Sequence, residues 1–112
     1  MLDQVEIDRL RGEKIAPQKL FIDGGWVSGE GDELEVLSPI DGSVLTTLTR
    51  GSSRDMARAI ASARTAFDDG RWSRMPPAGR KKVLHRLADL IEREALALTV
   101  LGVRDNGTEI NM

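Results

Sequence analysis

The sequence predicts an α+β fold in which two β-hairpins are followed by two or three helices. Two turns predict the hairpins: Asp23-Gly24 stands between two short apolar runs, and residues 38–42 (SPIDG) stand between two longer ones. The helices are predicted by a change near Arg50-Gly51, where apolar residues begin to recur every three or four positions instead of every second one. With 112 residues, the chain has room for a single small domain.

Residues 1–18 are expected to form an N-terminal arm that precedes the hairpins. Four apolar residues allow one or two amphipathic helical turns that end near Gly12 and Pro17, namely Leu2, Val5, Ile7 and Leu10. The first hairpin is then predicted to pair residues 20–22 with 25–27, and the second to pair 34–37 with 44–48.

The first long helix is predicted to begin at a capping box, Ser52 to Asp55, in which aspartate replaces the usual glutamate. Its apolar stripe consists of Met56, Ile60, Ala63 and Phe67, and it should stop near Asp69-Gly70.

Pro77 suits the first turn of a second long helix, because its missing N–H is not needed there. The predicted buried face of that helix consists of Val83, Leu84, Leu87, Ala88 and Ile91. A break is expected near residues 92–94, and the helical pattern then resumes until residues 105–107.

Composition excludes several classes of site. The chain has no cysteine, so it offers no disulfide, no thiolate ligand and no cysteine nucleophile. Its formal net charge is −2, and its basic cluster is interpreted as a solvated helix face rather than a nucleic-acid surface, because no aromatic residues interleave it: Arg71, Arg74, Arg80, Lys81, Lys82 and Arg86. No apolar run is long enough to span a membrane, and the charged N-terminus does not resemble a secretion signal, so a cytoplasmic location is expected.

The residues themselves point to no catalytic site. His85, the only histidine, is expected at the margin of its helix or on its solvent side, and the glycine pairs do not open a helix as phosphate-binding glycines do. Asp105 is the carboxylate that stands out, because it belongs to an Asp-Asn-Gly turn after an apolar helix. Its simplest role there is to cap or bridge backbone groups.

Six segments, in this order, resemble the start of the aldehyde dehydrogenases. They are residues 20–27 (LFIDGGWV), 38–45 (SPIDGSVL), 55–67, 72–76 (WSRMP), 80–92 and, in part, 101–107. The ending at residues 105–110 (DNGTEI) looks more like enzymes that act on ω-amino aldehydes, such as γ-glutamyl-γ-aminobutyraldehyde dehydrogenase.

The resemblance implies oxidation of a small aldehyde to a carboxylic acid by an NAD- or NADP-dependent enzyme that is a homodimer or homotetramer. It implies that residues 19–112 are the N-terminal, truncated part of an α/β Rossmann-like cofactor domain. The family's cysteine, glutamate base, oxyanion asparagine and glycine-rich nucleotide turn all come later in the chain, so these 112 residues alone are expected to be inactive.

The resemblance also implies one site within this stretch. Some family members bind K⁺ or Na⁺ through backbone carbonyls before the second hairpin turn and through the aspartate after the long helix. These positions correspond to Val36, Leu37 and Asp105, and oxygen ligands suit such a hard cation. Two residues depart from the family pattern: Gly102 replaces a glutamate, and Arg104 replaces an apolar residue. Arg104 could form an ion pair with Asp105 in place of the cation.

Two other functions remain open from the sequence. The chain could be a free-standing helical module that binds a partner, or a truncated product without a function.

Overall fold

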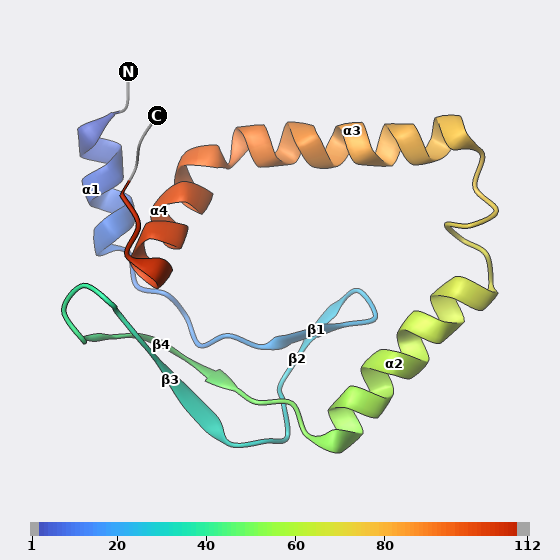
Figure 1. Cartoon of the computed structure of the whole chain (residues 1–112), viewed down its shortest axis with the longest axis horizontal. Coiled ribbons are helices and arrows are strands. Elements are labelled where there is room, and N and C mark those ends of the chain that lie inside the picture. The colour runs from blue at the N-terminus through green and yellow to red at the C-terminus, as the bar shows by residue number, and fades with distance from the viewer. Residues whose placement is uncertain (1–2, 110–112) are drawn as a thin grey trace.

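The computed structural model describes residues 3–109, so Leu2 of the predicted arm helix lies outside the described residues. The elements follow one another around a ring with an open centre, and the ring is completed where the first helix contacts the last (Figure 1). In chain order they are α1 (Gln4–Gly12), β1 (Leu20–Ile22), β2 (Gly25–Val27), β3 (Glu33–Leu37), β4 (Val44–Thr49), α2 (Ser53–Asp68), α3 (Pro77–Arg93) and α4 (Ala95–Asn106). The predicted α+β order of hairpins before helices is confirmed, with the arm helix added in front.

The first hairpin, β1–β2, turns at the two residues that the sequence indicated. Asp23 has φ of 53° and Gly24 has φ of 74°, the left-handed pair that a tight two-residue hairpin turn requires. Phe21 pairs with Trp26 across the strands, and their ring centroids lie 5.0 Å apart. This aromatic pair stabilises a hairpin of only three residues per strand.

The second hairpin, β3–β4, forms a separate two-stranded sheet and contains a bulge. Its register shifts between Val36 and Leu37, because Val36 lies opposite Thr46 while Leu37 lies opposite Val44. Gly42 closes the turn with φ of 74°. The segment that precedes β1 is tied to this sheet, because the amide of Gln18 donates to the carbonyl of Thr47 at 2.8 Å.

Helix α2 begins at the predicted capping box. The side chain of Ser52 accepts a hydrogen bond from the amide of Asp55, and the Asp55 carboxylate accepts one from the amide of Ser52. Gly29 and Gly31 lie in the loop that packs beside this helix start. A Cβ at either position would lie within 2.7 Å of the Arg50 carbonyl oxygen, so only glycine permits this close approach.

Helices α3 and α4 are joined almost directly. Pro77 occupies the first position of α3, and the helical run breaks at Glu94, as the sequence predicted. Helix α4 ends at Asn106, where Gly107 takes the left-handed conformation with φ of 74°.

The predicted buried face of the second long helix is wrong for this chain. Leu84, Leu87 and Ile91 of α3 are each more than half exposed, as are Met56 and Ile60 of α2. Among the described residues, the buried hydrophobic side chains are Ile7 and Val100, where α1 meets α4. The apolar residues recur along each helix as the sequence predicted, but no element within residues 3–109 covers them.

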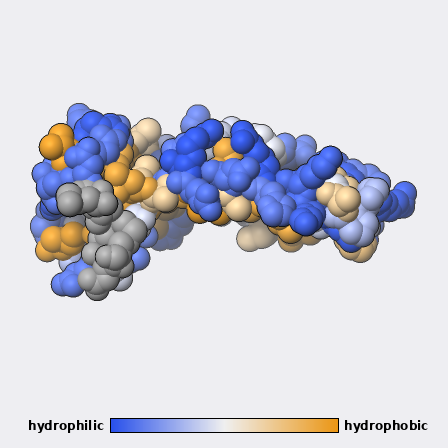
Figure 2. All heavy atoms as spheres, turned by 90° about the horizontal axis from the view of Figure 1, so that it is seen from above, coloured by the Kyte–Doolittle hydropathy of each residue, from blue (hydrophilic) through white to orange (hydrophobic). Residues whose placement is uncertain are grey.

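The size of the molecule agrees with this lack of a core. Its radius of gyration is 17.9 Å, whereas a compact chain of this length has about 13 Å. It exposes 8770 Å², compared with about 6,100 Å² for a compact protein of its mass. The molecule is a slab only 18 Å thick, and Figure 2 shows its thin edge, largely polar along α3 with hydrophobic residues at the border.

Candidate functional site

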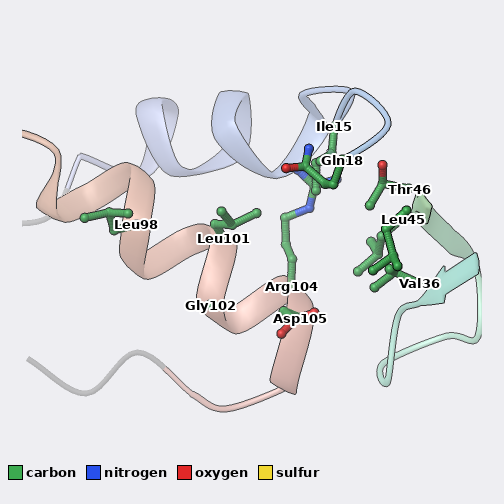
Figure 3. Close-up of a pocket in the computed structure, with 11 residues that line it drawn as sticks. Ile15, Gln18, Val36, Leu45, Thr46, Leu98, Leu101, Gly102, Arg104 and Asp105 are labelled. Carbon is green, nitrogen blue, oxygen red and sulfur yellow. The ribbon is translucent and has the colours of Figure 1, made fainter. Parts of the chain in front are cut away.

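A pocket of about 450 Å³ lies where α4, the β3–β4 hairpin and the segment before β1 meet (Figure 3). Its lining is mainly aliphatic, with four polar or charged residues among the apolar ones. The polar and charged residues are Gln18, Thr46, Arg104 and Asp105. The residue Gly102 leaves open space on the α4 side, because a Cβ there would meet nothing within 4 Å.

The pocket brings together two of the three residues assigned to the cation site. Val36 and Asp105, 69 positions apart in sequence, both line it. Leu37 is 54 % exposed and is not part of the lining. The hairpin turn and the end of α4 also approach each other, because a Cβ on Gly107 would lie 3.2 Å from Cγ of Pro39.

The bulge in β3–β4 lies at the same place. A bulge interrupts the regular ladder of hydrogen bonds, and this one falls between Val36 and Leu37, whose carbonyls are the assigned ligands. No residue pattern predicted the bulge, because both strands have ordinary β-forming residues on either side of it.

Asp105 lies in the last turn of α4 rather than in the turn after it. The bridging role predicted for Asp105 is played by its neighbour, because the Asn106 side chain accepts hydrogen bonds from the amide and the hydroxyl of Thr108 at 2.8 and 2.7 Å. The carboxylate of Asp105 is exposed at the pocket.

Arg104 does not form the ion pair with Asp105 that the sequence left open. Its guanidinium donates to the carbonyl oxygens of Leu10 and Glu13, at 3.2 and 2.9 Å. In Figure 3 the side chain reaches toward Ile15 and Gln18, away from the Asp105 carboxylate. The signal for an unusual role was present in the sequence, because Arg104 is the first charged residue after Glu94 and follows a largely apolar run, residues 95–103.

The start of α2 holds the other cluster of charged groups, and its geometry is structural. Asp55, 2 % exposed, accepts hydrogen bonds from the amides of Ser52 and Glu30, at 2.9 and 2.8 Å. The amide of Ser52, with that of Glu30, holds the pKa of the Asp55 carboxyl below its ordinary value. Oδ2 of Asp55 accepts the hydrogen bonds of the capping box and of the Glu30 amide, and Oδ1 lies 3.5 Å from Nη1 of Arg58, so the carboxylate is engaged in holding the helix start together.

This helix start also does not fit a nucleotide phosphate. It follows a strand, as phosphate-binding helices do, but the amide of Asp55 already donates to the Ser52 side chain and the amide of Ser52 to the Asp55 carboxylate. A phosphate there would be repelled by the Asp55 carboxylate. Within residues 3–109, no group of three or more histidine, aspartate or glutamate side chains could hold a metal ion, and His85 is exposed on α3.

Comparison with known proteins identifies the family. Residues 26–112 match the model of the aldehyde dehydrogenase family. The chain belongs to the aldehyde dehydrogenase family. Among curated relatives it is 41 % identical over 95 residues to aminoacetaldehyde dehydrogenase of Pseudomonas aeruginosa, and 40 % identical over 93 residues to the NADP/NAD-dependent aldehyde dehydrogenase PuuC of Escherichia coli. These alignments cover 84 % and 82 % of this chain, but only 19 % of each relative.

Solved aldehyde dehydrogenases contain the same fold. The apo structure of an indole-3-acetaldehyde dehydrogenase superposes with a TM-score of 0.85 at 35 % identity, covering 96 % of this chain and 25 % of that one. The γ-glutamyl-γ-aminobutyraldehyde dehydrogenase of Burkholderia cenocepacia gives 0.83 at 32 % identity, covering 92 % and 21 %. An indole-3-acetaldehyde dehydrogenase in complex with NAD⁺ also superposes, with a TM-score of 0.82 at 35 % identity. The open ring with its uncovered helices is therefore a substructure of these larger enzymes.

None of the helices described in residues 3–109 has the length and apolar content that a membrane span requires.

Proposed function

We propose that this chain forms the N-terminal part of the cofactor domain of an NAD- or NADP-dependent enzyme that oxidises a small aldehyde to its carboxylic acid. Residues 1–18 are the arm, and residues 19–112 belong to the cofactor domain. The observation that carries the proposal is the match of residues 26–112 to the aldehyde dehydrogenase family together with superposition on solved members of it. The resemblance at residues 105–110 and the relatives that act on amino aldehydes favour an ω-amino aldehyde as the substrate class.

The role of these residues in such an enzyme is architectural. They contain no thiol to attack the aldehyde, and the family's glycine-rich nucleotide turn is expected outside these residues. The exposed apolar faces of α2 and α3 supply surface on which later parts of the enzyme pack. We further propose a cytoplasmic enzyme that assembles as a homodimer or homotetramer and binds neither nucleic acid nor membrane.

An activity measurement tests the two parts of this proposal separately. The purified 112-residue chain, mixed with an ω-amino aldehyde and NAD⁺ or NADP⁺, should produce no NADH or NADPH above a buffer blank. A chimera in which this chain replaces the aligned 95 residues of the P. aeruginosa aminoacetaldehyde dehydrogenase should retain aldehyde-dependent NADH formation within about tenfold of the parent enzyme. Turnover by the chain alone would contradict the architectural role, and a folded but inactive chimera would contradict the assignment to the cofactor domain.

We also propose that Asp105 and the carbonyls of Val36 and Leu37 bind K⁺ or Na⁺. Three observations support it: Val36 and Asp105 line one pocket, the bulge interrupts the ladder beside Val36, and Arg104 is engaged elsewhere. A carboxylate and carbonyls are oxygen donors of the kind that hard cations prefer, with water and other parts of the enzyme completing the shell. The Asp105 carboxylate should then lie within about 6 Å of the Leu37 carbonyl oxygen in a cation-bound structure.

A matched pair of variants tests the cation site. In the chimera described above, where the rest of the enzyme is present, Asp105→Ala should abolish the stabilisation that K⁺ gives over K⁺-free buffer of equal ionic strength, measured as the shift of the thermal unfolding midpoint. Glu92→Ala removes an exposed carboxylate from α3 and should leave that shift intact. Equal responses to K⁺ in the two variants would contradict the site.

A further inference from the structure

Helix α1 is held on the rest of the molecule through its contact with α4. The two helices lie side by side where the ring closes, and Ile7 and Val100 are buried at this junction (Figure 1). The polar side chains of α1 mostly pair with each other, as Arg9 does with Glu6 and Glu13. The arm therefore has one apolar anchor on α4.

Arg104 supplies the second anchor. The carbonyls of the last turn of a helix have no partners within the helix, and a cation there also interacts favourably with the helix dipole. Nη1 of Arg104 donates to the carbonyls of Leu10 and Glu13 at the end of α1, more than 90 positions away in sequence. Arg104 therefore supplies both a hydrogen-bond donor and a positive charge at this helix end. One side chain of α4 thus caps the arm helix.

The chain after α1 is anchored independently on β4. The hydroxyl of Thr46 donates to the carbonyl of Ala16 at 2.9 Å, and the amide of Gln18 donates to the carbonyl of Thr47 at 2.8 Å. Only Lys14 and Ile15 lie between this anchor and the carbonyl of Glu13 that Arg104 binds. The contacts that hold α1 on α4 are therefore separate from the hydrogen bonds that hold Ala16 and Gln18 on β4.

We propose that α1 is a strap held by Arg104, and that its docking controls the charge beside Asp105. In the docked state, the Arg104 guanidinium is committed to α1 and points away from Asp105. In the undocked state, it is released next to the adjacent Asp105 carboxylate in the same pocket, where it competes with a cation. Strap docking and cation binding at Asp105 therefore favour each other by the same factor. The second half of this inference rests on the proposed cation site.

Limited proteolysis tests the strap without any cation. Trypsin cleavage after Arg9 or Arg11 follows the population of the undocked arm, provided that redocking is faster than cleavage. Arg104→Leu removes the cap and should raise the rate of these cleavages about tenfold, as expected for loss of charge-assisted hydrogen bonds. Arg104→Lys keeps the charge but loses the planar guanidinium, so it should give an intermediate rate.

The control variant is Arg93→Leu, which removes an exposed arginine paired only with its exposed neighbour Glu94. It should leave the arm cleavage rate unchanged. Equal rates in Arg93→Leu and in both Arg104 variants would overturn the strap.

Deletion of residues 1–14 tests the coupling to the cation. The deletion frees Arg104 permanently, so it should reduce the K⁺-dependent shift of the unfolding midpoint, and Arg104→Leu added to the deletion should restore it. An unchanged K⁺ response in the deletion variant would overturn the coupling. If the chimera that carries the intact chain shows no K⁺ response, the proposed cation site and the coupling fail together, while the proteolysis result still decides whether Arg104 holds the strap.

Discussion

Asp55 shows how one residue joins two segments of this chain. Its carboxylate completes the capping box of α2 with Ser52, and it also accepts a hydrogen bond from the amide of Glu30 in the preceding loop. The Glu30 side chain in turn pairs with Arg54 on the first turn of the same helix. The sequence predicted the capping box from four consecutive residues, but it did not predict the contact to Glu30, which depends on how the Gly29–Gly31 loop packs against Arg50.

Asp55 should make the stability of the chain depend on pH at acidic values. The pKa of its carboxyl is lowered in the folded state, so its contribution is present above the pKa of an unfolded aspartate, about 3.9, and is lost as pH falls through the lower folded pKa. Asp55→Asn removes this titration while keeping the shape of the side chain. Urea unfolding of the variant between about pH 2 and 6 should give a flatter dependence of the free energy of unfolding on pH than the parent shows.

The control for this measurement is Asp89→Asn, which alters an exposed carboxylate on α3. If both variants show the same dependence on pH as the parent, the hydrogen bonds to Asp55 do not stabilise the folded chain.

At the scale of elements, α3 differs most from its sequence-based interpretation. It has the apolar periodicity of a core helix over 17 residues, yet Val83, Leu84, Leu87 and Ile91 are each about half exposed. Their spacing predicted which side of the helix is apolar, and the structure agrees on the helix and its ends. The spacing could not predict whether a neighbour covers that side, because the covering surface belongs to another element.

The uncovered face of α3 should make the isolated chain associate or bind hydrophobic dyes. Replacing both Leu84 and Leu87 with glutamine should lower dye fluorescence and concentration-dependent light scattering, because each leucine gains on the order of 1 kcal/mol when a partner surface covers it. Lys81→Gln on the same helix should change neither signal. The helix should persist in far-UV circular dichroism, since the two leucines contribute little buried area in the free chain.

A monomer that binds no dye and unfolds in one sharp transition would contradict this expectation. It would favour the alternative function, a self-sufficient helical module that binds a partner.

At the scale of the whole molecule, the open ring and the family relationship have one physical explanation. The chain exposes about 2,700 Å² more than a compact protein of its mass, more surface than a standard protein–protein interface buries. The matched relatives are about five times longer than the aligned region. An exposed surface of this size, with apolar side chains along α2 and α3, is what we expect where one part of a large domain packs on another.

The sequence by itself determined the features that depend on neighbouring residues. The Asp23-Gly24 turn, the capping box at Ser52, the start of α3 at Pro77 and the left-handed end of α4 at Gly107 each follow from local backbone preferences and hydrogen bonds within a few positions. For the candidate site, the sequence provided the three assigned residues through the family resemblance alone.

Only the tertiary structure decided which distant groups meet. It placed Val36 and Asp105 on one pocket, put a bulge beside them, and directed Arg104 to the end of α1 instead of to Asp105. The pocket and the contacts of Arg104 join segments separated by a long stretch of chain. Their geometry depends on the path of every turn and helix between them, and periodicity along the sequence carries no information about that path.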